Sequence, residues 1–486
     1  MSAIESYEIK NNGADKNINL SEAHLTWFAL NPNSGGVNKA QDGQNLGTAA
    51  YTNGGNWLCA SIAFANREGI NRDSDYPLTE NVADMAYPET DRYSQTAGIT
   101  AEDVTLISGA DDIKTAIMNN GSVTCSFYSN DTYLTKEYSA SGIFASYYCP
   151  DPVQVNHGVA LVGWDDNYSK DHFKVRVPSS NGAWIAKNSY GDAWGNGGGY
   201  FMISYEDGSL SQAASWSVLD TGEFVNNYSH TSAVFASTIS NYNTYASVYT
   251  ADGYEMIDNI GIFNMADDAE VTVSVYKHLS PDGSPESGSF AGSRSRYFKK
   301  EGYYTFYFGN IPLDPGERFA VVVSISCPGK VKIPVETASM GEFTCNANES
   351  YLKTGSGWFD LTKNAGTKLG NTYVFVNTKC RHNFETRKIP ATCLNSGKAE
   401  VCCAYCGRIE SESVIPATGH HFRTVSSESG DSNEIIYTKI CADCGSTRSE
   451  SYHKGSKTVT FAELMQRIFE MIFGRLKGLK AGRITK

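Results

Sequence analysis

Basic residues are a minority in this sequence, which has 40 Lys and Arg against 53 Asp and Glu and a formal net charge of -13 at pH 7. A chain this acidic is not expected to bind nucleic acid. No stretch reaches the ~18 consecutive apolar residues that a membrane-spanning helix needs. The first residues lack a basic region followed by an apolar core, so no secretion signal is expected in the chain as given.

Cysteine is scarce at the start of the chain. Only Cys59, Cys125 and Cys149 lie in the first 220 residues, which is too few for a disulfide framework. Seven of the 12 cysteines lie between Cys380 and Cys444, where their spacing is typical of metal ligands. A length of 486 residues predicts about two to four domains.

Two polar residues stand at the edges of apolar runs. His157 precedes Gly-Val-Ala-Leu-Val, and Asn188 follows Ala-Trp-Ile-Ala-Lys. Two adjacent strands would bring the imidazole and the carboxamide together. An Asn that accepts the Nδ1 proton of this His would fix its tautomer and leave Nε2 facing a nucleophile.

This pair resembles the papain-like cysteine peptidases (peptidase family C1), whose His lies in D/N-H-A/G-V and whose Asn lies in K-N-S-W-G. Tyr190 replaces the usual Trp, and its ring and that of Trp194 are expected to shield the Asn–His hydrogen bond. The resemblance implies that His157 activates a Cys thiolate and then protonates the leaving amine, while Asn188 holds His157 in place. No cofactor is expected for this catalysis.

The same resemblance implies a cleft for an extended peptide or protein substrate. Asn53-Gly54-Gly55 matches the family's N-G-G, whose glycine backbone pairs with the substrate because no Cβ blocks close approach. Trp57 is then expected to wall a side-chain pocket, with Gly158 opposite.

The nucleophile itself is expected upstream of Met1, which would leave this exact chain inactive. Ser2–Ser6 matches the stretch a few residues after the family's Cys, and residues 1–10 are predicted to form a helix without an N-cap. Cys59 is expected inside a second helix over residues 57–69, as a buried thiol. The alternative function is a catalytically dead surface protein that binds or adheres through its later domains.

The predicted fold is a papain-like α+β domain with a helical lobe and a β-barrel lobe over residues 1–219. Its strands are expected at 123–127, 158–164, 183–187 and 199–205, with a short helix at 111–119. Short alternating strands over 220–379 predict a β-sandwich, with strands at 232–236, 256–263, 270–276, 302–308 and 318–325.

The sandwich resembles the lectin-like domain of some bacterial papain-like peptidases, through Leu313–Phe319 and Gly355–Leu361. The resemblance implies a secreted, extracellular or cell-surface protein with contact to carbohydrate or to the cell surface. Its exposed aromatic rings could stack on sugars, but half-buried packing explains such rings equally well.

Residues 380–453 contain two Cys/His-rich repeats, in which His382 recurs as His420 and Cys403 as Cys441, 38 residues later. Such residues are ligands for tetrahedral structural zinc, although disulfides or metal-free thiols stay open. The first predicted ligand set is Cys403, Cys406, His382 and His420, with Cys393 as a competitor. The second predicted set is Cys441, Cys444, His421 and His453.

The tail over residues 454–486 is predicted to form a basic amphipathic helix, which Thr460 and Glu463 begin with a capping box. One face carries Phe461, Leu464, Ile468, Ile472, Leu476 and Leu479. A membrane surface or a partner helix would suit that face, and so would packing on the preceding repeats.

Overall fold

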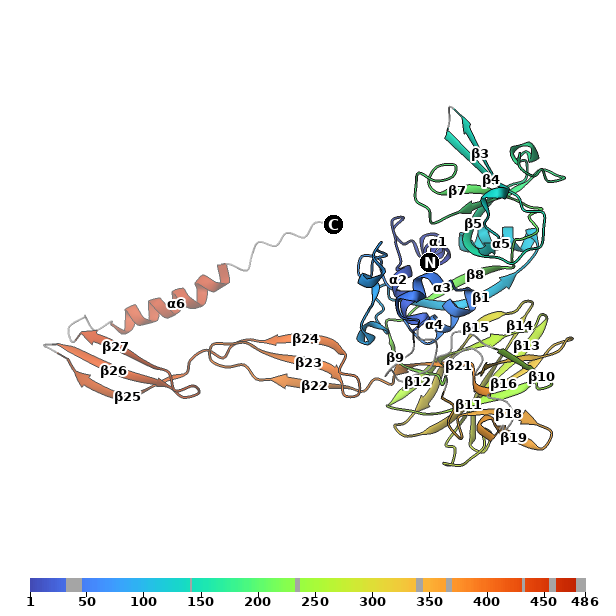
Figure 1. Cartoon of the computed structure of the whole chain (residues 1–486). Helices are drawn as coiled ribbons and strands as arrows, with labels where there is room; N and C mark the ends of the chain where they lie inside the picture. Colours follow the sequence, from blue (N-terminus) through green and yellow to red (C-terminus); the bar gives the residue numbers. More distant parts are fainter. Residues whose placement is uncertain are drawn as a thin grey trace. The chain divides into compact units, whose positions relative to one another are not determined.

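The computed structural model describes residues 1–31, 46–139, 142–231, 237–337, 344–363, 369–430, 433–453 and 460–477. They form two compact units, Met1–Arg381 and His382–Lys486 (Figure 1).

The first unit begins with short helices. They are α1 (Ser2–Tyr7, continued by a π-helical turn over Glu8–Asn12), α2 (Glu22–Ala29), α3 (Ala50–Asn53) and α4 (Trp57–Ala65). The Ser21 hydroxyl caps α2 by accepting from the His24 amide, and the Asn56 carboxamide caps α4. Met1 offers no side-chain cap to α1, as the sequence predicts.

A long sheet follows the helices, with the strand order β3-β4-β7-β6-β5-β2-β8-β1-β15-β12-β21-β9. Every neighbouring pair is antiparallel except β4 with β7. Its first eight strands are β1 (Ile99–Ile107), β2 (Val123–Phe127), β3 (Leu134–Ser139), β4 (Gly142–Tyr147), β5 (His157–Asp165), β6 (Ala183–Lys187), β7 (Tyr200–Ser204) and β8 (Ala213–Asp220). Helix α5 (Ala110–Asn120) joins β1 to β2.

The other four strands of that sheet come from the predicted sandwich: β9 (Phe224–Tyr228), β12 (Glu255–Asn264), β15 (Gly302–Leu313) and β21 (Val374–Cys380). The two parts of the chain join where Val104 of β1 pairs with Tyr303 of β15. They also share one apolar core, in which Phe64 and Trp216 are buried with Phe263 and Tyr303. The helical lobe and the sandwich therefore bury their side chains together.

The opposite layer of the sandwich is a six-stranded sheet, accompanied by a three-stranded one. The six strands are β11 (Thr244–Thr250), β13 (Ala269–Lys277), β14 (Ser289–Phe298), β16 (Arg318–Ser326), β18 (Ser350–Thr354) and β19 (Gly357–Asp360). The three are β10 (Ser237–Ser240), β17 (Lys332–Thr337) and β20 (Leu369–Thr372). Alternate residues of β13 are buried, as expected for a strand with one face in a core. The strand predicted at 232–236 lies outside the described residues.

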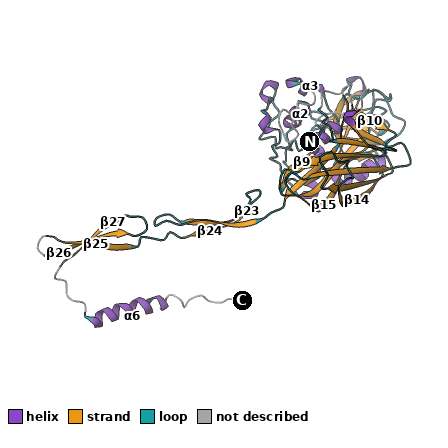
Figure 2. Ribbon diagram, turned by 90° about the horizontal axis from the view of Figure 1, so that it is seen from below, coloured by secondary structure: helices purple, strands orange, loops and turns teal. Residues whose placement is uncertain are grey.

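The second unit contains two separate three-stranded sheets and a helix (Figure 2). The sheets are β22 (Phe384–Ile389), β23 (Gly397–Cys403) and β24 (Ile409–Ile415), then β25 (Phe422–Ser429), β26 (Glu434–Cys441) and β27 (Thr447–His453). Helix α6 (Phe461–Lys477) begins after Thr460, whose amide and hydroxyl donate to the Glu463 carboxylate. Within the described part of the chain, no helix is long and apolar enough to cross a membrane.

The shared core makes a prediction about unfolding. Phe263 is fully buried, and its ring contacts those of Trp57 and Tyr303. We expect Phe263→Ala to lower the free energy of unfolding by about 3–5 kcal/mol. In a urea titration, the peptidase part and the sandwich should unfold in one common transition, and its midpoint should move to a lower urea concentration. Phe290→Ala is the control, because Phe290 is exposed. Two separate transitions, only one of them shifted, would contradict a shared core.

Candidate active site

The ends of two neighbouring strands place His157 beside Asn188. Strand β5 begins at His157, strand β6 ends at Lys187, and the two pair with Ala160 opposite Lys187. His157 Nε2 lies 2.9 Å from Asn188 Oδ1. The predicted juxtaposition of the imidazole and the carboxamide is therefore present.

The ring nitrogen that faces Asn188 differs from the prediction. Asn188 Oδ1 bonds Nε2, so this nitrogen carries the proton and Nδ1 is left as the acceptor. The motif predicts the opposite assignment, with Nδ1 facing Asn188 and Nε2 facing the nucleophile. Strand direction decides which edge of the ring meets the carboxamide, and a motif does not carry that information. A nucleophile would accordingly meet Nδ1.

Backbone groups hold Asn188 in this orientation. Its Oδ1 also accepts a hydrogen bond from the Ser189 backbone amide at 2.9 Å. The backbone amide of Asn188 donates to the Gly199 carbonyl at 2.9 Å. Gly199 has a φ of 78°, and a Cβ there would lie 3.0 Å from the Asn188 carbonyl oxygen. With Asn188 only 6% exposed, the carboxamide has little freedom to turn away from His157.

Three aromatic rings surround the pair. The Tyr190 ring lies 5.3 Å from the His157 ring, and Trp194 meets Tyr190 edge-on at 5.3 Å. Phe127 of β2 meets His157 edge-on at 5.8 Å. Tyr190 and Trp194 thus stand where the resemblance expects shielding rings. Phe127 was missed, because only the pairing of β2 with β5 puts it opposite His157.

A cavity of about 260 Å³ adjoins Asn188 on the side of these rings. Its lining combines aromatic and polar side chains: Phe127, Ser129, Asn130, Asp131, Leu134, Lys136, Tyr147, Asn188, Tyr190, Trp194 and Phe201. Seven of these 11 residues come from the segment that runs from β2 through β4, for which the sequence predicts no role in the site.

The predicted cleft residues lie between α3 and α4. Asn53 ends α3, and Gly54 and Gly55 are exposed, with a φ of 73° at Gly54 that favours glycine. The Trp57 ring packs toward Phe263 of β12, with 6.4 Å between the ring centroids. Trp57 therefore packs against the shared core, a role that could not be predicted from the residues around it in the sequence. Gly158 follows His157 on β5, opposite Ser126.

The cysteines of this domain are buried and weakly acidic. Burial raises the pKa of the Cys59 thiol to about 11 and that of Cys125 to about 12. Cys125 Sγ lies 3.7 Å from the Ser211 carbonyl oxygen, and Cys149 Sγ lies 3.6 Å from that of Asp151. Such thiols stay protonated near neutral pH and are poor nucleophiles. None of the 12 cysteines, all of which the structure describes, forms a disulfide.

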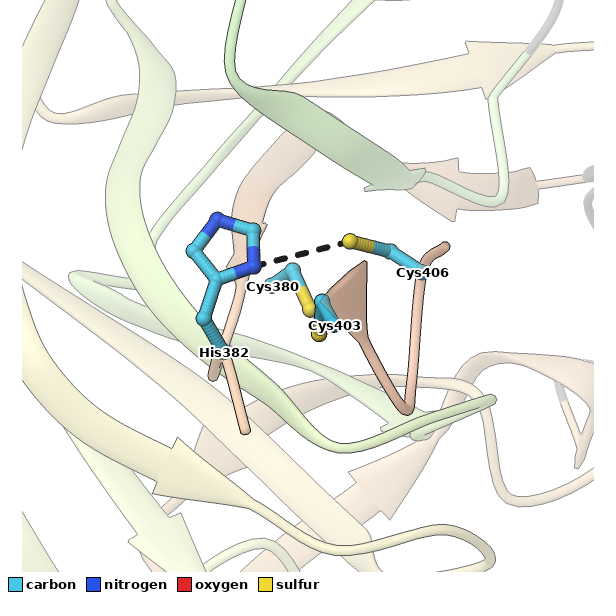
Figure 3. A group of neighbouring side chains, drawn as sticks. All are labelled: Cys380, His382, Cys403 and Cys406. Carbon is cyan, nitrogen blue, oxygen red and sulfur yellow. Dashed lines mark hydrogen bonds between the residues drawn. The ribbon is translucent and has the colours of Figure 1, made fainter. Parts of the chain in front are cut away.

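The Cys/His-rich repeats gather their side chains in two groups, whose membership differs from the predicted ligand sets. The first group holds His382, Cys403 and Cys406, together with Cys380, which stands two residues before His382 in the chain (Figure 3). His382 Nδ1 lies 3.5 Å from Cys406 Sγ. Cys380 thus takes the place that was predicted for His420.

The second group holds Cys393, His420, Cys441 and Cys444, so Cys393 competes for this group and not for the first. The predicted ligands His421 and His453 lie elsewhere. His421 Nδ1 bonds the Asp443 carboxylate at 2.6 Å. His453 pairs with Glu434, at the opposite end of β26 from Cys441. Seven steps along a strand separate those ends by roughly 20 Å.

Family models match the first two parts of the chain. One described as papain family cysteine protease matches residues 1–218, and one described as lectin like domain matches residues 226–373. The first part of the chain is therefore similar to the papain family of cysteine proteases, and a region similar to a lectin-like domain follows it. The predicted two-lobed fold with an appended β-sandwich is confirmed, and the family supports a cysteine peptidase function.

Solved structures match both parts together. The clostridial cysteine protease Cwp84 after propeptide cleavage is 26% identical, with a TM-score of 0.66 over 78% of this chain and 92% of that one. A second structure holds the cysteine protease and lectin-like domains of Cwp84, a surface layer associated protein of Clostridium difficile. It is 25% identical, with a TM-score of 0.62 over 78% and 83% of the two chains.

Two curated relatives match shorter stretches of the chain. The probable cysteine protease RD19B of Arabidopsis thaliana is 30% identical over 27% of this chain. Digestive cysteine proteinase 3 of Homarus americanus is 21% identical over 33% of it. The matches span only 33% and 45% of the lengths of these relatives.

Substitutions at two glycines test whether the backbone contact of Gly199 holds Asn188 in place. Gly199→Ala and Gly197→Ala both place a side chain at positive φ, but only at Gly199 would the Cβ press on the Asn188 carbonyl, since nothing lies within 4 Å at Gly197. We expect Gly199→Ala to lower the free energy of unfolding by about 1 kcal/mol more than Gly197→Ala, measured by urea titration. It should also perturb the ¹⁵N shifts of the His157 ring. Equal effects of the two variants would show that the contact with Asn188 is unimportant.

Proposed function

We propose that the peptidase domain hydrolyses peptide bonds in extended segments by a Cys-His-Asn mechanism, with His157 as the general base and acid. The hydrogen bond from His157 Nε2 to Asn188 Oδ1 carries this proposal. It fixes the tautomer in which Nδ1 can take a proton from a thiol and later give it to the leaving amine. Asn188 orients the ring and stays uncharged throughout.

The rings around the pair support this chemistry. Tyr190 and Trp194 limit the access of water to the His157–Asn188 bond, which strengthens that bond during proton transfer. The adjoining cavity is large enough for a substrate side chain, and it offers aromatic surface together with Asp131 and Lys136.

The thiolate, on this proposal, is none of the chain's own 12 cysteines. Cys59 and Cys125 are buried with raised pKa values, and the sulfurs of Cys125 and Cys149 lie against backbone carbonyls. The resemblance implies a cysteine ahead of α1, a helix that contacts β2 and β8 close to the strand bearing His157. We propose that the 486 residues alone do not cleave peptides and that the native protein acts at the cell surface.

Peptide hydrolysis by two forms of the protein tests this proposal. We expect no cleavage of unfolded casein by the 486-residue chain, and cleavage by a form extended with the cysteine-bearing segment that precedes α1. In the extended form, His157→Ala should lower kcat/KM on the order of 10³-fold, because proton transfer is lost. Asn188→Ala should lower kcat/KM by a smaller factor, because the His157 imidazole is still present.

The matched control is His172→Ala, which removes a half-exposed imidazole paired with Glu137 outside the site. Cleavage by the 486-residue chain that disappears with His157→Ala would place the nucleophile among the 12 cysteines. An inactive extended form would favour the second function, a surface protein that binds through its sandwich and repeats.

A further inference from the structure

The described part of the second unit has almost no apolar core. Among its described residues, the buried apolar side chains are those of Cys393, Cys403 and Cys441, and no Leu, Ile, Val or Phe is buried. Three-stranded sheets of this size do not bury enough surface to offset the entropy lost on folding. Small domains of this kind depend on additional cross-links for stability, either disulfides or a bound metal ion.

The donor atoms of Cys393, His420, Cys441 and Cys444 all lie within 4.8 Å of one another. Cys393 Sγ is 3.6 Å from Cys441 Sγ, and Cys444 Sγ is 3.3 Å from His420 Nδ1. Tetrahedral zinc with its usual bond lengths would separate two sulfurs by about 3.8 Å, and a sulfur from a nitrogen by about 3.5 Å. A disulfide would need about 2.05 Å between sulfurs. The spacing thus fits ligands around an ion.

The backbone around the paired cysteines is shaped for such an ion. In Cys441-Ala-Asp-Cys444-Gly445, the Gly445 amide donates to the Cys441 carbonyl at 3.0 Å, and Gly445 has a φ of 74°. The first repeat builds the same turn, with Gly407 bonded to Cys403 and also at 74°. Two independent copies of one turn, each with its second cysteine sulfur next to a His Nδ1, indicate a built site.

The four ligands come from both repeats. Cys393 belongs to the loop between β22 and β23 of the first repeat, 48 residues before Cys441. Cys441 and Cys444 belong to the second repeat, and His420 lies just before its first strand. The Thr418 amide donates to the Thr392 carbonyl at 3.0 Å, so the same two segments also meet through the backbone.

We propose that Cys393, His420, Cys441 and Cys444 bind one Zn²⁺, and that this ion fastens the first Cys/His-rich repeat to the second. Binding displaces the thiol protons to solvent and leaves three thiolates and a neutral imidazole around the ion. The zinc–ligand bonds then provide, where the two repeats meet, the stabilisation that a hydrophobic core would otherwise give. The site is structural, since four protein ligands leave no open position for catalysis.

Zinc content of the whole chain tests the proposal. We expect Cys393→Ser to lose about one equivalent of zinc relative to the unaltered protein, measured by inductively coupled plasma mass spectrometry. Cys402→Ser is the matched control, because Cys402 lies in the same repeat and in neither group. Cobalt substitution should give the absorption of tetrahedral thiolate-bound Co²⁺, weakened in Cys393→Ser only. Equal zinc content in the two variants, or no zinc at all, would overturn the proposal.

Two further readouts separate a zinc junction from its alternatives. Thiol titration under denaturing, non-reducing conditions should find Cys393 and Cys441 reduced, and a missing pair of thiols would identify a disulfide instead. Proteinase K should cleave segment 416–421 faster after chelation, and faster in Cys393→Ser without chelation, but not in Cys402→Ser. Unchanged cleavage would show that the ion does not join the repeats. Peptidase activity enters none of these measurements.

Discussion

The antiparallel pairing of β5 with β6 is the constraint on which the candidate active site depends. It runs the two strands in opposite directions, so the start of one and the end of the other meet at the same edge of the sheet. His157 and Asn188 are neighbours for that reason alone, although 31 residues separate them in the chain. The neighbouring strand β2 then supplies Phe127, and Gly199, directly before β7, supplies a backbone contact.

The same sheet continues from the peptidase part into the lectin-like part. Four of its strands belong to the sandwich, and the pairing of β1 with β15 carries the hydrogen bonding across. The aromatic residues Trp57, Phe64 and Trp216 from one part pack with Phe263 and Tyr303 from the other. Gly54 and Gly55 of the predicted substrate cleft come just before α4. Helix α4 packs on the shared core, so the lectin-like part helps to hold the helix that follows these glycines.

Much of this could be predicted from the sequence, because its signals are local. The strands around His157 and Asn188 follow from apolar runs, and the capping residue of α6 follows from Thr460 and Glu463. The continuous sheet could not be predicted, since it depends on a pairing between residues almost 200 positions apart. The ring nitrogen of His157 that meets Asn188 depends on three-dimensional geometry in the same way. In the repeats, the 38-residue period identifies the cysteine pairs but not Cys380 and Cys393, which have no counterpart one period later.

The pairing of β1 with β15 has a consequence for how this protein could have evolved. Neither module can be exchanged freely for another, because separation near residue 220 would expose the buried side chains of Val104, Phe64 and Trp216 to water and would leave an edge of β1 unpaired. Such an edge recruits strands from other molecules and leads to aggregation. The peptidase and lectin-like parts are therefore expected to be inherited together, as a single evolutionary unit, whereas the repeats that follow can vary in number without disturbing that sheet.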